Sequence, residues 1–229
     1  MTKKTIVTWL LGIFLIIAVA LPAAYIGVTE LAARRGIPEA QSELGRWYDE
    51  GLWLHPTNKR EAATWYTKAA ESGYAKGQYN LGLLLKQQGD YQGAAHWYLL
   101  AAKQDYAPAQ NNLAVLYFEG LGVTKNQRTA VFWYEKAAQN GNEIAQYSLG
   151  LAYMNGRGVG VDYKKGVYWI QQSAKQDFAT AQGHLALLYA TGDGVKEDYA
   201  EALLWAKKAY ANGNNQAADT IKIVEQLQQ

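Results

Sequence analysis

The sequence predicts an all-α fold, an α-solenoid of five helix–turn–helix repeats behind an N-terminal transmembrane helix. Three observations support this prediction: an uncharged apolar run near the start of the chain, a unit that recurs every 36 residues, and helical spacing of the apolar residues within each unit. A single pair of short amphipathic helices cannot bury its apolar faces, whereas a stack of such pairs can.

The N-terminal segment has no charged residue between Lys4 and Glu30. Its apolar stretch, 6–28, spans 23 residues, and a helix that crosses a bilayer needs about 20. Because Lys3 and Lys4 precede this stretch, the positive-inside tendency leaves the N-terminus in the cytoplasm. We therefore expect a single-pass protein of the inner (cytoplasmic) membrane with its repeats on the periplasmic side.

A cleaved signal sequence is the alternative interpretation of the same segment. Ala18-Val19-Ala20 fits an A-x-A cleavage site. The apolar run is longer than the roughly 7–15 residues of a signal-peptide core, which favours a retained anchor. Residues 1–29 are thus predicted to be an anchor or a signal sequence, and residues 30–37 a short linker.

Composition excludes several classes of function. The 22 basic and 20 acidic residues leave a net charge of +2, and Lys3 and Lys4 account for that excess. Without a basic stripe, nucleic acid is not expected as a partner. The absence of cysteine excludes disulfides, thiolate metal sites, a cysteine nucleophile and a lipid-bearing cysteine.

The repeats are evident from self-comparison. Segments that start at Ala109, Ala145 and Ala181 align without a gap, and two earlier copies start at Ala40 and Gly77 with loops of other lengths. The aligned copies share Leu113, Leu149 and Leu185, Tyr117, Tyr153 and Tyr189, and Trp133, Trp169 and Trp205. The predicted repeats are 38–74, 75–106, 107–142, 143–178 and 179–214, and 215–229 is expected to form a capping helix.

Glycine pairs in three copies have the form Gly-x-Gly-Val, beginning at Gly120, Gly156 and Gly192. A phosphate-binding loop is needed once per active site, whereas a turn is needed once per repeat. No Lys-Ser/Thr pair follows any copy and no apolar strand precedes one. The glycines are therefore interpreted as turns that need positive φ.

The second helix of every repeat has a start signal. The expected N-caps, whose side-chain oxygens accept from free backbone N–H groups, are Asn58, Asp90, Asn126, Asp162 and Asp198. The helix is expected to stop at Gly73, Gly141 and Gly213, and at Asp105 and Asp177 in the other two copies.

At these residues the chain resembles the Sel-one-like repeat (SLR) family, a branch of the tetratricopeptide superfamily. The resemblance covers about residues 38–214. The second copy lacks the glycine turn and matches a plain tetratricopeptide repeat, and in the first copy Trp53 replaces the second glycine. The resemblance implies a scaffold or adaptor that binds proteins. Exported bacterial members include envelope regulators and immunity proteins that neutralise secreted antibacterial lipases.

The first helices of such a solenoid line its concave wall, and the residue two positions after the recurring Leu lies about 200° around the helix from it. This places a mainly apolar strip opposite the core stripe. The predicted protein-binding residues are Tyr79, Leu83, Lys86, Asn111, Val115, Phe118, Tyr147, Leu151, Met154 and Leu187. A groove for an extended or helical peptide is one interpretation, and packing between repeats is the other.

The remaining candidates are Trp53 and His55 in the unusual first loop, which are predicted to make a special contact or to cover the membrane-proximal end. No catalytic, cofactor-binding or metal-binding set can be recognised, so no enzyme and no cofactor is expected. The predicted function is a membrane-tethered, exported interaction module that binds an envelope or periplasmic protein. The alternative is an immunity protein that neutralises a phospholipase-type effector in the periplasm.

Overall fold

The computed structural model describes residues 24–227, which form helices joined by short loops without any strand. The predicted all-α solenoid is confirmed for this part of the chain. The predicted membrane segment, 6–28, lies outside the described residues except for its last five positions. From residue 24 onward, no helix combines the length and the apolar character needed to cross a membrane.

The chain forms two compact units, which divide after Leu84. The described part of the N-terminal unit contains a helix over residues 24–34, α2 (Pro38–Glu50), α3 (Lys59–Glu71) and the start of α4 (Ala75–Gln87). Buried Ala33 and Leu44 pack with Trp47, which is fully buried. The helix that precedes the first repeat thus shares a core with it.

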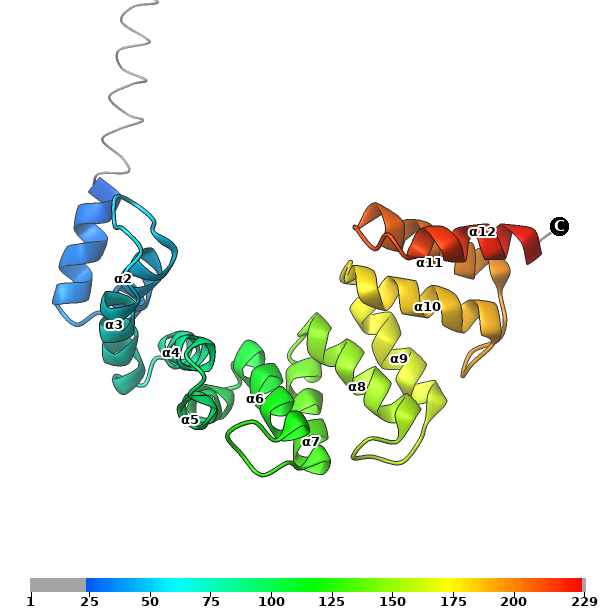
Figure 1. The fold of residues 1–229 in the computed structure, drawn as a ribbon, viewed down its shortest axis with the longest axis horizontal. Helices are drawn as coiled ribbons and strands as arrows, with labels where there is room; N and C mark the ends of the chain where they lie inside the picture. The colour runs from blue at the N-terminus through cyan, green and yellow to red at the C-terminus, as the bar shows by residue number, and fades with distance from the viewer. Residues whose placement is uncertain (1–23, 228–229) are drawn as a thin grey trace, which may run out of the picture. The chain divides into compact units, whose positions relative to one another are not determined.

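The C-terminal unit stacks helix pairs in sequence order, from green to red in Figure 1. Each helix from α5 to α12 packs against the next one along the chain, and α12 also contacts α10. The helices are α5 (Tyr91–Ala102), α6 (Ala107–Glu119), α7 (Gln127–Gln139), α8 (Glu143–Asn155), α9 (Tyr163–Ala174), α10 (Ala179–Thr191), α11 (Tyr199–Ala211) and α12 (Ala217–Leu227).

All five predicted N-caps are confirmed. Each side-chain oxygen accepts from a backbone N–H in the first turn of its helix; for example, Asp162 Oδ1 accepts from Lys165 N at 3.0 Å. The N–H of the same residue donates back to the first helix, as Asp162 N does to Tyr153 O at 2.9 Å. One residue therefore starts the second helix and also ties it to the first.

The glycine turns confirm the interpretation as bends. Gly156 and Gly158 have φ of +65° and +77°, a region that residues with a side chain rarely adopt. A Cβ on Gly158 would lie 2.3 Å from Gln127 O, at the start of the second helix of the preceding repeat. Gly122 approaches the Tyr91 carbonyl in the same way. The second glycine therefore lets each turn pack against the preceding repeat.

A buried glutamine links successive repeats. In the fourth repeat, Gln146 Nε2 donates to Ala138 O at 3.1 Å, at the end of the preceding second helix. Its Oε1 accepts from Gln176 Nε2 at 2.8 Å, at the end of its own second helix. Equivalent donations come from Gln41, Gln78, Gln110 and Gln182. Each of these carbonyls also accepts a backbone N–H at its helix end, as Ala138 O does from Gly141 N at 3.1 Å. The glutamine therefore adds a second bond to the carbonyl, and it joins each first helix to the helix before it.

Candidate functional site

The predicted partner-binding residues lie on the first helices of the second to fifth repeats. In the C-terminal unit, six of them on α6, α8 and α10 are at least partly exposed, and we call them the first-helix face: Val115, Phe118, Tyr147, Leu151, Met154 and Leu187. The three residues on α4, namely Tyr79, Leu83 and Lys86, are half-buried.

Most of the first-helix face also takes part in packing. Val115 and Phe118 rest against a core cluster that includes Leu149 of the next repeat. Leu151 and Met154 rest in the same way against a cluster that includes Leu185. Packing between repeats is therefore present, although these side chains also meet solvent, and the groove for a peptide stays a prediction.

Leu187 is the most open member of the face. Its side chain is 48% exposed, and no core cluster of the described residues includes it. A large apolar side chain held open to water on a rigid helix is a natural contact point for a partner.

Asn111 is buried, contrary to the expectation. It is only 6% exposed. It stands two residues before the recurring Leu, and the equivalent residues of later repeats show why this position is covered. The Tyr147 ring lies 5.7 Å from that of Phe178 at the start of α10. A Cβ on Gly183 would lie 2.4 Å from Asn214 Nδ2. Asn111 therefore faces the following repeat and not a partner, whereas Tyr147 at the equivalent position is only half-buried.

An apolar hollow of about 230 Å³ lies between α6 and α8. Val115, Phe118 and Leu151 line it, with Glu119 and Arg157 among the further lining residues. The Arg157 guanidinium carbon stands 5.9 Å from the centre of the Phe118 ring, within the range of a cation–π contact. Such a hollow suits an apolar side chain whose neighbour carries a polar or acidic group.

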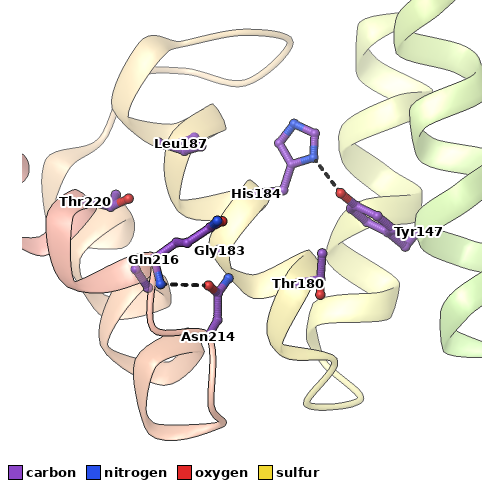
Figure 2. Close-up of a pocket in the computed structure, with 9 residues that line it drawn as sticks. Tyr147, Thr180, Gly183, His184, Leu187, Asn214, Gln216 and Thr220 are labelled. Atoms are coloured by element: carbon purple, nitrogen blue, oxygen red, sulfur yellow. Dashed lines mark hydrogen bonds between the residues drawn. The ribbon is translucent and has the colours of Figure 1, made fainter.

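A second, more polar hollow of about 270 Å³ lies between α8, α10 and α12 (Figure 2). Tyr147 and His184 face one another in it, with the Tyr147 hydroxyl 3.4 Å from His184 Nδ1. On the α12 side, Gln216 N donates to Asn214 Oδ1 at 3.2 Å. The remaining lining residues are Thr180, Gly183, Leu187, Ala217 and Thr220.

Burial sets the charge state of this polar hollow. It lowers the pKa of His184 below its ordinary value of 6.5 and raises the pKa of the Tyr147 hydroxyl above 10.0. Both side chains are therefore neutral at pH 7. The hollow offers neutral donors and acceptors, which suit a peptide group or an uncharged polar side chain better than an ion.

The two hollows adjoin along α8. Leu151 lines the apolar hollow and Tyr147 lines the polar one. Residues four apart are neighbours on one helix face, so these side chains are one turn apart. A chain laid across α8 can place an apolar side chain in one hollow and form hydrogen bonds in the other.

The unusual first loop keeps the left-handed backbone of the glycine turns, although Trp53 stands in place of the second glycine. Trp53 and Leu54 have φ of +53° and +66°, a strain of about 1–3 kcal/mol for each such residue. His55 ties this loop down: its Nδ1 lies 2.9 Å from Trp53 O and its Nε2 lies 3.0 Å from Glu30 Oε1. The Trp53 ring stands 5.8 Å from that of Tyr25.

Sequence reasoning missed the residues that complete the polar hollow. Asn214 is the last residue of the fifth repeat, and Gln216 lies just before α12, outside the repeats. Periodicity gives no signal for Gln216. A signal for His184 exists, because the residue before the recurring Leu is polar in all five copies: Glu43, Asn80, Asn112, Ser148 and His184.

Five consecutive stretches of the chain match the model of the Sel1 repeat: residues 38–74, 75–106, 107–142, 144–178 and 179–214. The chain belongs to the Sel1 repeat family. The resemblance predicted from the repeats is thereby confirmed. Sel1 repeats typically mediate contacts between proteins. No curated protein matches this Sel1 repeat chain.

Solved Sel1 structures resemble this one closely. A Sel1 repeat protein from Oxalobacter formigenes is 37% identical with a TM-score of 0.74, over 84% of this chain and 78% of that one. The protective antigen c5321 of uropathogenic Escherichia coli is 32% identical with a TM-score of 0.78, over 83% of this chain but only 42% of that one. The immunity protein Pa5087 of Pseudomonas aeruginosa is 20% identical with a TM-score of 0.56, over 85% and 74%, and so shares the fold alone.

Proposed function

We propose that this Sel1 repeat protein is a membrane-tethered interaction module that holds a protein partner on its first-helix face. The observation that supports this most is the pair of adjoining hollows on α8, one apolar and one polar. Their lining residues come from adjacent repeats, so only the stacked solenoid builds them.

The chemistry of the face indicates how a partner binds. Apolar side chains bind in the hollow beside Leu151, and backbone or amide groups pair with His184 and Asn214. Because the helices are fixed by buried glutamines such as Gln146, the face is ordered before a partner arrives. A preorganised surface loses little conformational entropy on binding.

The proposed location follows from the sequence. An apolar segment, 6–28, anchors the chain in the inner membrane, and the repeats stand on the periplasmic side. The partner is then another envelope or periplasmic protein. Because the chain is anchored, it can bind that partner only close to the bilayer.

An immunity role, the alternative expected from the sequence, uses the same face to cover a toxin. The likeness to Pa5087 is one of fold at 20% identity and does not favour this role over an adaptor. An adjacent gene for a secreted lipase would favour it.

Site-specific photo-crosslinking in cells tests the proposed binding face. A photoreactive amino acid replaces Leu187 on α10 or, as a matched control, Leu204 on α11 of the same repeat. The two side chains are 48% and 46% exposed but belong to the first and second helix, respectively. We expect a discrete cross-linked protein from position 187 and not from position 204. Equal products from both positions, or a product from 204 alone, would refute the first-helix face as the binding surface.

A further inference from the structure

Exposed apolar side chains gather at the N-terminal end of the described chain. Among residues 24–227, six of the 16 large apolar side chains that are exposed lie between residues 25 and 54. Five of them form what we call the N-terminal patch: Tyr25, Val28, Leu31, Trp53 and Leu54. A soluble surface has no reason to concentrate apolar side chains in this way.

The patch joins one helix to one loop. Tyr25, Val28 and Leu31 are spaced by three residues on the helix over 24–34, which places them on one exposed stripe. The ring contact of Tyr25 with Trp53 connects this stripe to the loop. Leu54, at the tip of the loop, is 98% exposed.

The backbone of this loop keeps its apolar tip, Trp53 and Leu54, exposed to solvent. In the third, fourth and fifth repeats a glycine stands at the position of Trp53, because the preceding repeat leaves no room for a Cβ there; at Gly158 the Cβ would lie 2.3 Å from Gln127 O. At the first repeat the neighbouring element is the helix over 24–34, and the Trp53 ring has room beside Tyr25 of that helix. The two contacts of His55 then fix the strained backbone to Glu30 and to the loop itself.

We infer that the N-terminal patch contacts the lipid bilayer and seats the first repeat on the membrane surface. The last residues of the apolar segment 6–28 include Tyr25 and Val28, and the helix continues past them to residue 34. The patch therefore stands where the chain would leave the bilayer. Tyrosine and tryptophan are the side chains that favour the membrane–water interface. Arg35, which is exposed and directly follows that helix, supplies a cation for lipid phosphates.

This inference rests on the proposed membrane tether and adds to it that the first repeat lies against the lipid. A tether alone leaves the angle between the first repeat and the membrane surface unspecified. A seated first repeat instead fixes the distance from the membrane at which the solenoid begins.

Spin labelling of the full chain tests the inference, and the absence of cysteine makes every introduced cysteine a unique site. Leu54→Cys and the control Val161→Cys, a 58%-exposed position in the fourth repeat, receive a nitroxide. Each protein is reconstituted into vesicles of phosphatidylethanolamine and phosphatidylglycerol. Membrane-soluble oxygen and a water-soluble nickel chelate then compete to relax the nitroxide.

We expect oxygen to relax the label at position 54 more than the nickel chelate does, and the reverse at position 161. Flotation of the same vesicles reports the tether separately. If the chain floats but the label at position 54 is as accessible to nickel as that at position 161, lipid contact is wrong and the tether stands. If the chain does not float, the tether fails and the inference fails with it.

Discussion

The Tyr147 hydroxyl lies 3.4 Å from His184 Nδ1, across the boundary between the fourth and fifth repeats. Their rings meet nearly edge to face, with centroids 5.9 Å apart. Neither residue shares a helix with the other, so only the stacking of α8 on α10 creates this pair. The polar hollow is thus a property of the assembled repeats.

The protonation of His184 gives a prediction about pH. Because burial lowers its pKa below 6.5, the folded protein binds fewer protons at this site than the unfolded chain does as the pH falls below 6.5. Lower pH therefore favours unfolding, and the stability present above pH 6.5 is lost as the pH falls through the folded pKa. We expect NMR to show His184 titrating below 6.5, and His184→Gln to reduce the fall in the urea midpoint between pH 7 and pH 5. Titration at or above 6.5 would show that the site is not desolvated.

The glycines of the fourth turn give a matched pair of stability predictions. Gly158→Ala combines a φ of +77° with a Cβ 2.3 Å from Gln127 O, so we expect a loss of about 2–4 kcal/mol. Gly160→Ala has ordinary φ and no heavy atom within 4 Å, and should change stability by less than about 0.5 kcal/mol. Urea unfolding measures both, and similar losses in the two variants would contradict the packing role of Gly158.

The buried glutamines give a third prediction. Gln146→Met keeps most of the side-chain volume but removes the bonds to Ala138 O and to Gln176. Ala138 O keeps its bond from Gly141 N at 3.1 Å, so the cost is that of the two lost hydrogen bonds. Each contributes about 0.5–1.5 kcal/mol, and we expect a loss of about 1–3 kcal/mol in urea unfolding. Gln139→Met, at an exposed position of α7, is the control and should be close to neutral. A neutral Gln146→Met would mean that the links between repeats contribute no net stability.

The sequence was sufficient to predict the repeated elements, because each has a local physical cause. A short polar side chain starts each second helix, as Asp162 does, and paired glycines such as Gly156 and Gly158 permit the turn. The first loop also keeps its left-handed form, even though Trp53 replaces a glycine. Helix starts and turns that have a local cause in each repeat can therefore be predicted from a single sequence.

The site was only partly predictable, since it depends on contacts between repeats. Helical phase alone placed Asn111 on the open face, but the following repeat covers that position, and the residue is buried. The same helical phase did not identify His184, and Gln216 belongs to a segment outside the repeats. Whether such a residue is buried or open depends on the distance between stacked helices. The spacing of residues along one helix gives no information about that distance.

The structure also improves the choice of variant for testing partner binding. Leu151→Glu, an obvious choice from helical phase, would bring a charge against a core cluster, because Leu151 packs against the cluster that includes Leu185. Burial of an unpaired charge destabilises the fold. Leu187 is outside that cluster and is the better position, since its replacement removes a contact surface without opening the core.

The most direct measurement of the central claim is the affinity of two variants for the protein that cross-links to position 187. Leu187→Glu and Leu204→Glu add the same charge at equally exposed positions on the first and second helix of one repeat. We predict that Leu187→Glu weakens binding by about tenfold or more, which corresponds to about 1.4 kcal/mol, while Leu204→Glu stays close to the unmodified chain. Unchanged binding by Leu187→Glu, or an equal loss in both variants with helicity and melting temperature preserved, would contradict a partner held on the first-helix face.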